Sequence, residues 1–262
     1  MRKFTKLLFY ELKNIIKDKM TVILLVYPLM VIAIGSFILP ALLDRFGGDT
    51  PGTRVAALVM IILFATIAPF IGSVLLGFSL LDNRDENTLD TIRVTPLSLR
   101  GYILFKTVYT YVLTVLGSFF VVFGTKTLSG DGYTIMGVDL FADITVGLMF
   151  VYALTAGLFT PVFAFMLAAV SKNKIEGFAY MKTSGMIVLI PMLAVIETMQ
   201  DAKQYVLGIV PLFWPAKGLM VGGGLFDHPS DLPMALYMVF GALYMLALAF
   251  IGYRFFERNV SG

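Results

Sequence analysis

The sequence contains no cysteine, and among its 262 residues the only histidine is His228. Without cysteine the chain has no disulfide, no thiolate metal site and no cysteine nucleophile. A single histidine, placed beside Pro229, argues against a histidine-based triad and against a histidine-rich zinc site. Charge is also scarce, since 14% of the residues are charged and soluble domains carry roughly 25%. These shortages predict a protein that is not itself an enzyme and is not soluble.

Two motifs that resemble parts of catalytic or cofactor sites are incomplete. Ser184 and Gly185 match part of a membrane serine protease motif, but no histidine lies at membrane depth to act as the base. The glycines 222–224 are not followed by the G-x-x-x-x-G-K-[ST] pattern of a phosphate-binding loop. No basic surface domain remains for nucleic acid once the apolar runs are set aside. We therefore expect no catalytic residue, metal, cofactor or nucleic acid on this chain.

Apolar residues make up 58% of the sequence and fall into six long runs. About 20 helical residues cross the hydrocarbon core of a bilayer, so each run is long enough to span it. The pattern predicts an all-α integral membrane protein, formed as a single transmembrane domain over residues 1–262. The six predicted spans are 20–43, 55–81, 101–124, 140–170, 178–196 and 232–256.

One further apolar segment, residues 206–226, does not have the pattern of a straight spanning helix. It contains Pro211, Pro215 and the three glycines 222–224, which interrupt a helix. We interpret it as a re-entrant or interfacial element on the outer side, before the last span. The alternative is a seventh span, which would place the C-terminus outside.

Lysine and arginine are distributed unequally between the two sides of the predicted membrane. The positive-inside rule assigns the richer side to the cytoplasm. Fifteen basic residues lie on the side of the termini: Arg2, Lys3, Lys6, Lys13, Lys17, Lys19, Arg84, Arg93, Arg100, Lys106, Lys172, Lys174, Lys182, Arg254 and Arg258. Five lie on the other side: Arg45, Arg54, Lys126, Lys203 and Lys217. We therefore predict a multi-pass protein of the plasma (inner) membrane with both termini in the cytoplasm.

Residues 1–19 have the pattern of an amphipathic interfacial helix. The basic residues share one arc of about 100° on a helical wheel, and the apolar residues lie mostly opposite. Such a helix lies flat on the lipid of the inner membrane surface. Glu11 falls on the apolar side, which suggests a partner for it there. The alternative is a generic positively charged anchor.

The predicted spans have no ionisable residue near their centres. Lys106 and Lys182 lie within about five residues of the cytoplasmic ends, where a lysine side chain can reach the interface. Ion-coupled carriers usually keep ionisable groups near the midplane. Their absence argues against ion coupling. The mid-span prolines and small polar residues are interpreted chiefly as packing devices.

The loop 82–99 carries the most specific pattern in the chain. Asp82 or Asn83 is predicted to cap a short cytoplasmic helix that ends before Pro96. Acidic residues fall in its first turn and a basic residue near its last, which suits the helix dipole. Leu89 and Ile92, three residues apart, project together as an apolar pair. The alternative is a solvated hairpin.

The loop resembles that of type-2 ABC exporter permeases. The matching residues are Arg84-Asp85-Glu86, Thr88-Leu89-Asp90, Thr95-Pro96-Leu97-Ser98 and Lys106, with Asn87 where the family usually has glycine. Weaker matches are Glu11-Leu12-Lys13, Lys17-Asp18-Lys19 and Pro28 for the family's elbow helix, and Pro211-Leu212-Phe213-Trp214 for its outer re-entrant element. The resemblance covers the whole chain and the order of its elements.

The resemblance implies a permease that pairs with a second permease and with cytoplasmic ATP-binding subunits, which would hold the ATP and magnesium. Its loop residues would couple to the ATPase: Arg84, Asp85, Glu86, Thr88, Leu89, Ile92, Arg93 and Pro96. Its elbow helix would include Lys6, Glu11, Lys13 and Lys17. Cargo would pass along spans two and five, near Pro69, Ser73, Ser184 and Pro191.

The implied cargo is amphipathic or hydrophobic: a drug, a peptide antibiotic, a lipid or a lipid-linked molecule. The rival hypothesis is an ATP-independent membrane protein, such as a secondary carrier or an assembly factor. A neighbouring coding sequence for an ATPase with Walker motifs would distinguish the two.

Overall fold

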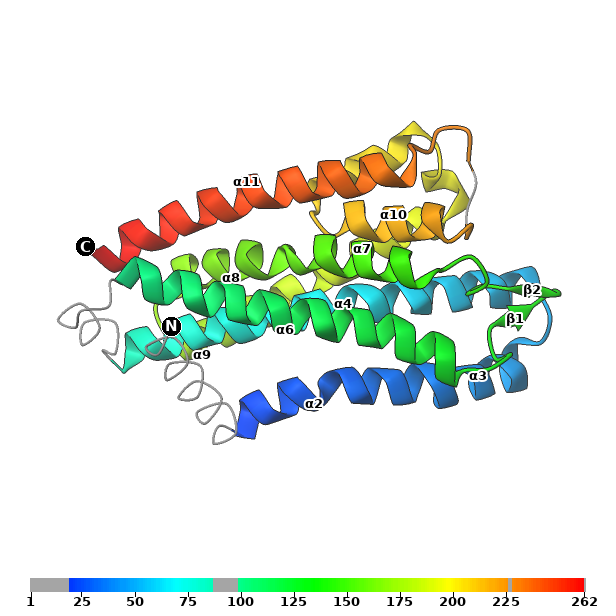
Figure 1. The fold of residues 1–262 in the computed structure, drawn as a ribbon, viewed down its shortest axis with the longest axis horizontal. Coiled ribbons are helices and arrows are strands. Elements are labelled where there is room, and N and C mark those ends of the chain that lie inside the picture. Colours follow the sequence, from blue (N-terminus) through cyan, green and yellow to red (C-terminus); the bar gives the residue numbers. More distant parts are fainter. Residues whose placement is uncertain (1–18, 87–98, 226–227, 262) are drawn as a thin grey trace.

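A computed structural model describes residues 19–86, 99–225 and 228–261. Within these residues, six helical segments are long and apolar enough to cross a membrane. They are Val26–Gly47, Pro51–Asp85, Leu99–Leu128, Val146–Val170, Lys174–Val195 and Met234–Asn259. The chain is an all-α integral membrane protein, as the six apolar runs predict (Figure 1).

Spans one and five combine more than one kind of helix, and span four joins two α-helices. Span one joins α2 (Lys19–Ala33), the π-helix η1 (Ile34–Ile38), α3 (Leu39–Leu42) and the π-helix η2 (Leu43–Gly47), and span two is α4 (Pro51–Asp85). Span three is α6 (Leu99–Leu128), followed by β1 (Thr134–Ile135) and β2 (Val138–Asp139), an antiparallel pair. Span four joins α7 (Val146–Gly157) and α8 (Phe159–Val170), and span five joins α9 (Lys174–Ser184) and the 3-10 helix η3 (Gly185–Val195). The 3-10 helices η4 (Glu197–Met199) and η5 (Ala202–Ile209), then α10 (Phe213–Gly222), lead to span six, α11 (Met234–Ser261).

Local sequence explains where several helices begin and break. Thr50 caps α4 by accepting a hydrogen bond from the Thr53 backbone N–H, and Pro51 follows at the first helical position, where its missing N–H costs nothing. Span four breaks at Leu158, shortly before Pro161. Proline has no backbone N–H to donate to the carbonyl four residues earlier. Span four therefore breaks where the helix already lacks a backbone hydrogen bond.

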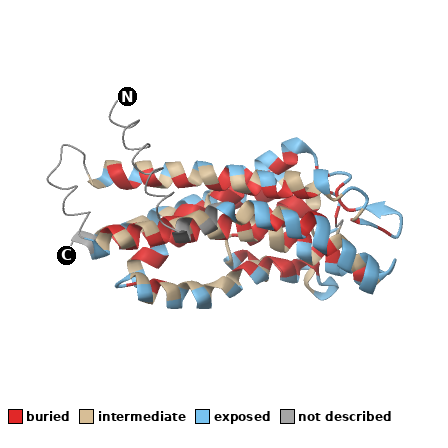
Figure 2. Cartoon of the chain, turned by 90° about the horizontal axis from the view of Figure 1, so that it is seen from below, coloured by how far each residue is buried: buried red, intermediate tan, exposed pale blue. Residues whose placement is uncertain are grey.

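The long helix α4 forms the centre of the bundle. Its outer half, including Leu58 and Ile62, belongs to one buried apolar cluster, and its inner half, including Val74 and Leu80, belongs to another. Gly72 lets α6 approach closely, because a Cβ at that position would lie 1.9 Å from Thr114 Oγ1. Figure 2 shows buried residues along the inside of the bundle and exposed residues along its outer faces.

The described ends of the chain lie at one end of the bundle. The start of α2 and the end of α11 lie on the same side in Figure 1, together with the α4 end and the α8–α9 connection. We call this the inner end. The β1–β2 pair and the segment from η4 to α10 lie at the opposite, outer end. This arrangement fits an even number of passes, while the side that faces the cytoplasm stays a prediction from the basic residues.

Orientation can be tested by single cysteines, because the chain has no native cysteine. Ser129 follows α6 at the outer end, and Asn87 follows the inner end of α4. An impermeant thiol reagent applied to whole cells is expected to label Ser129→Cys and to spare Asn87→Cys. Labelling of Asn87→Cys without Ser129→Cys would reverse the predicted topology.

The apolar segment before span six does not cross the bundle. Its main helix, α10, has 10 residues and is therefore ~15 Å long, about half the hydrocarbon thickness. Ile209, which precedes α10, lies beside the outer half of α11, because the Tyr244 hydroxyl donates to the Ile209 carbonyl at 2.9 Å. Tyr244 lies about 15 Å along α11 from its outer start. Whether this segment is re-entrant within the bilayer stays a prediction.

Two local expectations from the sequence are wrong. Asp82 and Asn83 do not cap a new helix, because α4 continues to Asp85 with Glu86 as its C-cap. Tertiary partners described below hold these residues in the last turn of α4. Lys106 does not extend to the interface, since the residue is 5% exposed and its Nζ donates to the Tyr102 hydroxyl at 3.1 Å.

Candidate functional site

The residues predicted to couple to an ATPase are described only in part. Arg84, Asp85 and Glu86 lie at the inner end of α4. The other predicted coupling residues, Thr88, Leu89, Ile92, Arg93 and Pro96, lie outside the described residues, as do Lys6, Glu11, Lys13 and Lys17 of the predicted elbow helix. Their roles stay predictions.

Arg84 is bound to the end of span four. Its guanidinium donates to the Ala168 carbonyl at 3.1 Å and also to the Ser171 carbonyl. Both carbonyls belong to the C-terminal turn of α8, whose last carbonyls have no partner within the helix. A cation is favoured there, because the helix dipole places partial negative charge at a C-terminus. Arg84 thus fixes the α4 end to the α8 end.

Asp85 and Asp82 are bound to the start of span five. The Lys174 backbone N–H donates to Asp85 Oδ2 at 2.9 Å, and Lys174 Nζ lies 2.9 Å from Asp82 Oδ1. The connection itself is ordered by Asn173, which caps α9 by accepting from the Glu176 backbone N–H at 2.9 Å. We call Asp82, Arg84, Asp85 and their partners in residues 168–174 the inner clamp.

The inner clamp changes the interpretation of the predicted coupling residues. The side chains of Arg84 and Asp85 are engaged within the chain, on the connection between spans four and five. Glu86 is exposed, and its side chain has no hydrogen bond or ion pair with the described residues. Among these three residues, Glu86 is therefore the one whose charge is directed outward.

Other polar contacts join the remaining helices at the inner end. Buried Asn83 donates to the Tyr102 hydroxyl at 3.1 Å, which links α4 to α6. Arg100 and Glu257 form an ion pair at 2.8 Å between α6 and α11, with Arg100 77% exposed. The sequence contains no local signal for these contacts, since their members are far apart in the chain.

The residues predicted to border the cargo path lie in different environments. Pro69 and Ser73 are buried inside the single chain, and the Ser73 hydroxyl donates to the Phe70 carbonyl at 2.5 Å. Pro191 is buried in η3, whereas Ser184 is partly exposed at the end of α9. The Ser73 hydroxyl is thus hydrogen-bonded within its own helix. A part for these four residues in transport stays a prediction.

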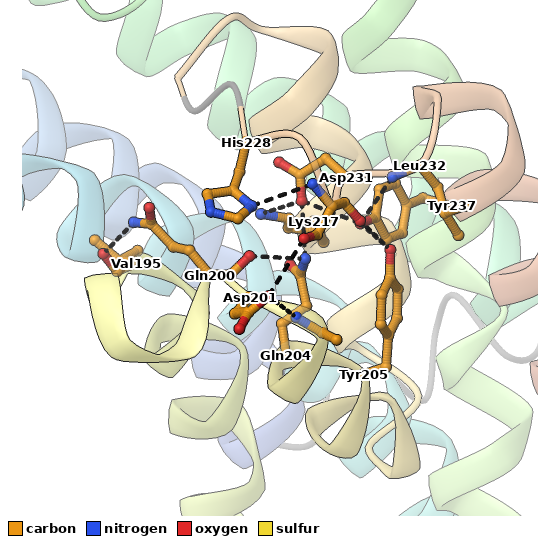
Figure 3. A network of polar contacts seen from close by, with 12 residues as sticks. Val195, Gln200, Asp201, Gln204, Tyr205, Lys217, His228, Asp231, Leu232 and Tyr237 are labelled. Carbon is orange, nitrogen blue, oxygen red and sulfur yellow. Dashed lines mark hydrogen bonds and ion pairs between the residues drawn. The ribbon is translucent and has the colours of Figure 1, made fainter.

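The outer end contains a buried ion pair. Lys217 is 0% exposed and Asp231 is 5% exposed in their side chains, and Lys217 Nζ lies 2.9 Å from Asp231 Oδ1. Gln204 Nε2 also donates to Asp231 Oδ1, at 3.0 Å. The Tyr205 and Tyr237 hydroxyls are 3.3 Å apart, and Tyr237 donates to Asp231 at 3.4 Å. Figure 3 shows this outer network, which joins η5, α10 and the start of α11.

The outer network was not predicted from the sequence, in which Lys217 is only one of five basic residues on the outer side. The available signal was a single lysine within the otherwise apolar α10. Two buried charges are costly unless they are paired. The pairing therefore indicates that α10 keeps a fixed position against the residues preceding α11.

No metal site is evident in the described part of the chain, where no group of three histidine, aspartate or glutamate residues lies close enough to hold an ion. The chemistry of both ends is that of charge pairing and backbone capping, which positions helices.

Comparison with known proteins gives a consistent set of relatives. A family model described as "Fluoroquinolones export permease protein Rv2686c-like" matches residues 11–253. Two Mycobacterium tuberculosis proteins are each 26% identical to this chain over 254 residues. They are fluoroquinolones export permease protein MT2760 of strain CDC 1551 / Oshkosh and fluoroquinolones export permease protein Rv2686c of strain ATCC 25618 / H37Rv. The similarity covers 95% of this chain and 92% of each relative, and the matched range includes the inner clamp and the outer network.

Proposed function

The chain belongs to the Rv2686c-like family of fluoroquinolones export permease proteins, and from this membership we propose that it is the membrane-spanning subunit of an ATP-driven drug exporter. The observation that carries the proposal is the similarity along 95% of the chain to two proteins named as export permeases. The six spanning helices supply the membrane path that such a subunit needs.

The proposed cargo is a fluoroquinolone or a drug of similar chemistry. The names of both relatives state this cargo for them. A fluoroquinolone is a flat, amphipathic aromatic molecule, which agrees with the amphipathic cargo that the sequence implies. Passage along spans two and five, beside Ser184, belongs to this proposal.

The proposed energy source is ATP hydrolysed on a separate cytoplasmic subunit, which would bind the nucleotide and magnesium. Two observations support it. The loop after α4 resembles the coupling loop of type-2 ABC exporter permeases, in which a short helix contacts the ATPase. Within the described spans, aspartate and glutamate occur only near the ends, whereas proton-coupled carriers place such residues near the midplane. A second permease, identical or related, would complete the transporter.

Drug accumulation in cells tests this proposal. Cells that co-express the chain and its ATP-binding partner are expected to accumulate less fluoroquinolone than cells with an empty vector. The matched control is the same complex whose ATP-binding subunit carries a Walker-motif lysine substitution, which should restore accumulation. Equal accumulation in all three strains would contradict the proposed function.

A further inference from the structure

Resting on this proposed function, we propose that Asp82, Arg84 and Asp85 are positioning residues that transmit movement of the coupling loop to span five. The family resemblance implies that Arg84 and Asp85 contact the ATPase. In the structure both side chains bind the connection between spans four and five. The ATPase would then act on the segment after Glu86, and the inner clamp would carry that movement into the membrane.

The position of the inner clamp supports this role. Its three α4 residues fall in the last turn of that helix, directly before residues 87–98, which include Leu89 and Ile92 of the predicted coupling pair. That segment joins the end of α4 to the start of α6, so its displacement acts on the α4 end. Because Arg84 and Asp85 hold the two sides of one short connection, the connection moves with α4.

The Asp82–Lys174 pair is oriented against both helix dipoles. Asp82 lies in the last turn of α4, where a cation is favoured, and Lys174 is the first residue of α9, where an anion is favoured. The pair therefore adds nothing to the stability of either helix through its dipole. Its distinctive contribution is the 2.9 Å contact that joins the two helices.

Span five has an inner part, α9, that packs closely on α4, and an outer part, η3, with a different helix geometry. Gly177 lets α9 pack closely on α4, since a Cβ there would lie 2.6 Å from Leu81 Cδ1. The Phe78 and Phe178 rings also contact, with centroids 4.6 Å apart. Beyond Ser184 the span becomes the 3-10 helix η3, and a 3-10 stretch within a longer helix often marks a hinge. Movement of the inner clamp would thus turn α9 about the α9–η3 junction.

Charge reversal tests the transmission directly. The variants are Asp82→Lys, Lys174→Asp and the double exchange, and the swapped pair suits both helix dipoles. Each is built in a complex that carries Met186→Cys, because Met186 is 69% exposed at the start of η3. The first readout is the ratio of thiol labelling rates with and without ATP. The second is fluoroquinolone export at saturating ATP.

Each single variant is expected to keep the ATP-binding subunit and its basal hydrolysis but to lose the ATP dependence of labelling. Export should fall by about fivefold, because each single reversal replaces a partly exposed ion pair by two like charges. The double exchange should recover both readouts. The matched control is the exchange Arg100→Glu with Glu257→Arg at the neighbouring inner-end ion pair, which does not involve the inner clamp and should leave both unchanged.

Two results would overturn the inference: single variants that keep ATP-dependent labelling, or single variants from which the ATP-binding subunit dissociates. The second result would return these residues to the ATPase contact surface. An error in the proposed cargo can be told apart from an error in the transmission inference, because the labelling ratio does not depend on the drug. A wild-type complex with ATP-dependent labelling and no fluoroquinolone export would contradict the cargo and leave the transmission supported.

Discussion

Replacing Leu89 and Ile92 together by aspartate is expected to abolish drug export. Leu89 and Ile92 are the large apolar pair of the short helix predicted in this loop, and each apolar side chain contributes roughly 1.5–3 kcal/mol when it leaves water. Two aspartates at a protein contact would instead have to be desolvated without a partner. We therefore expect the ATP-binding subunit to be released, or to hydrolyse ATP without driving export.

Co-purification and drug-stimulated ATP hydrolysis measure this effect. The matched control is Asn87→Asp with Thr91→Asp, which adds the same charge to the same segment at positions that do not share the helix face of Leu89 and Ile92. Membrane insertion should be normal in both variants, because the changes lie outside every span. Wild-type export and stimulation in the Leu89/Ile92 variant would remove this loop from the mechanism and favour the solvated hairpin.

Replacing Lys217 by methionine is expected to destabilise the outer end by about 3–5 kcal/mol. The lysine is fully buried, and its removal leaves the buried Asp231 carboxylate without this cation. Replacing both members of a buried ion pair by apolar residues is often neutral or stabilising. We therefore expect Lys217→Met with Asp231→Leu to recover much of the stability that Lys217→Met loses.

Thermal unfolding in mild detergent distinguishes these variants. Lys203→Met is the matched control, because Lys203 belongs to the same outer segment and is exposed. Its unfolding temperature should stay close to that of the wild type, while that of Lys217→Met falls clearly below it. An unchanged temperature for Lys217→Met would show that the ion pair does not hold the outer segment.

The positions of the spanning helices along the chain could be predicted from the sequence, because they follow from its hydropathy. The predicted span 55–81 lies within α4 (Pro51–Asp85), and the predicted span 101–124 lies within α6 (Leu99–Leu128). The residues at which helices end were predicted less accurately. Asp82 and Asn83 are good capping residues in isolation, yet Lys174 and Tyr102 bind them within α4.

The contacts that define both ends could not be predicted, because their partners are distant in the sequence. Arg84 binds carbonyls that are 84 and 87 residues away, and any backbone carbonyl has the same chemistry, so no residue type marks the partner. Lys217 and Asp231 lie closer together, but their pairing depends on how α10 turns back against α11. The positive-inside rule counts Lys217 as an exposed cation and contains no information about burial.

The most direct test of the account is the energy source of drug export. Inside-out vesicles that contain the chain with its ATP-binding subunit are given ATP and a fluoroquinolone, and drug uptake is measured with and without a protonophore. If ATP drives export, we expect uptake to require hydrolysable ATP and to persist after the proton gradient has been dissipated. Uptake that collapses with the gradient while ATP remains would contradict ATP-driven export and would favour a secondary carrier.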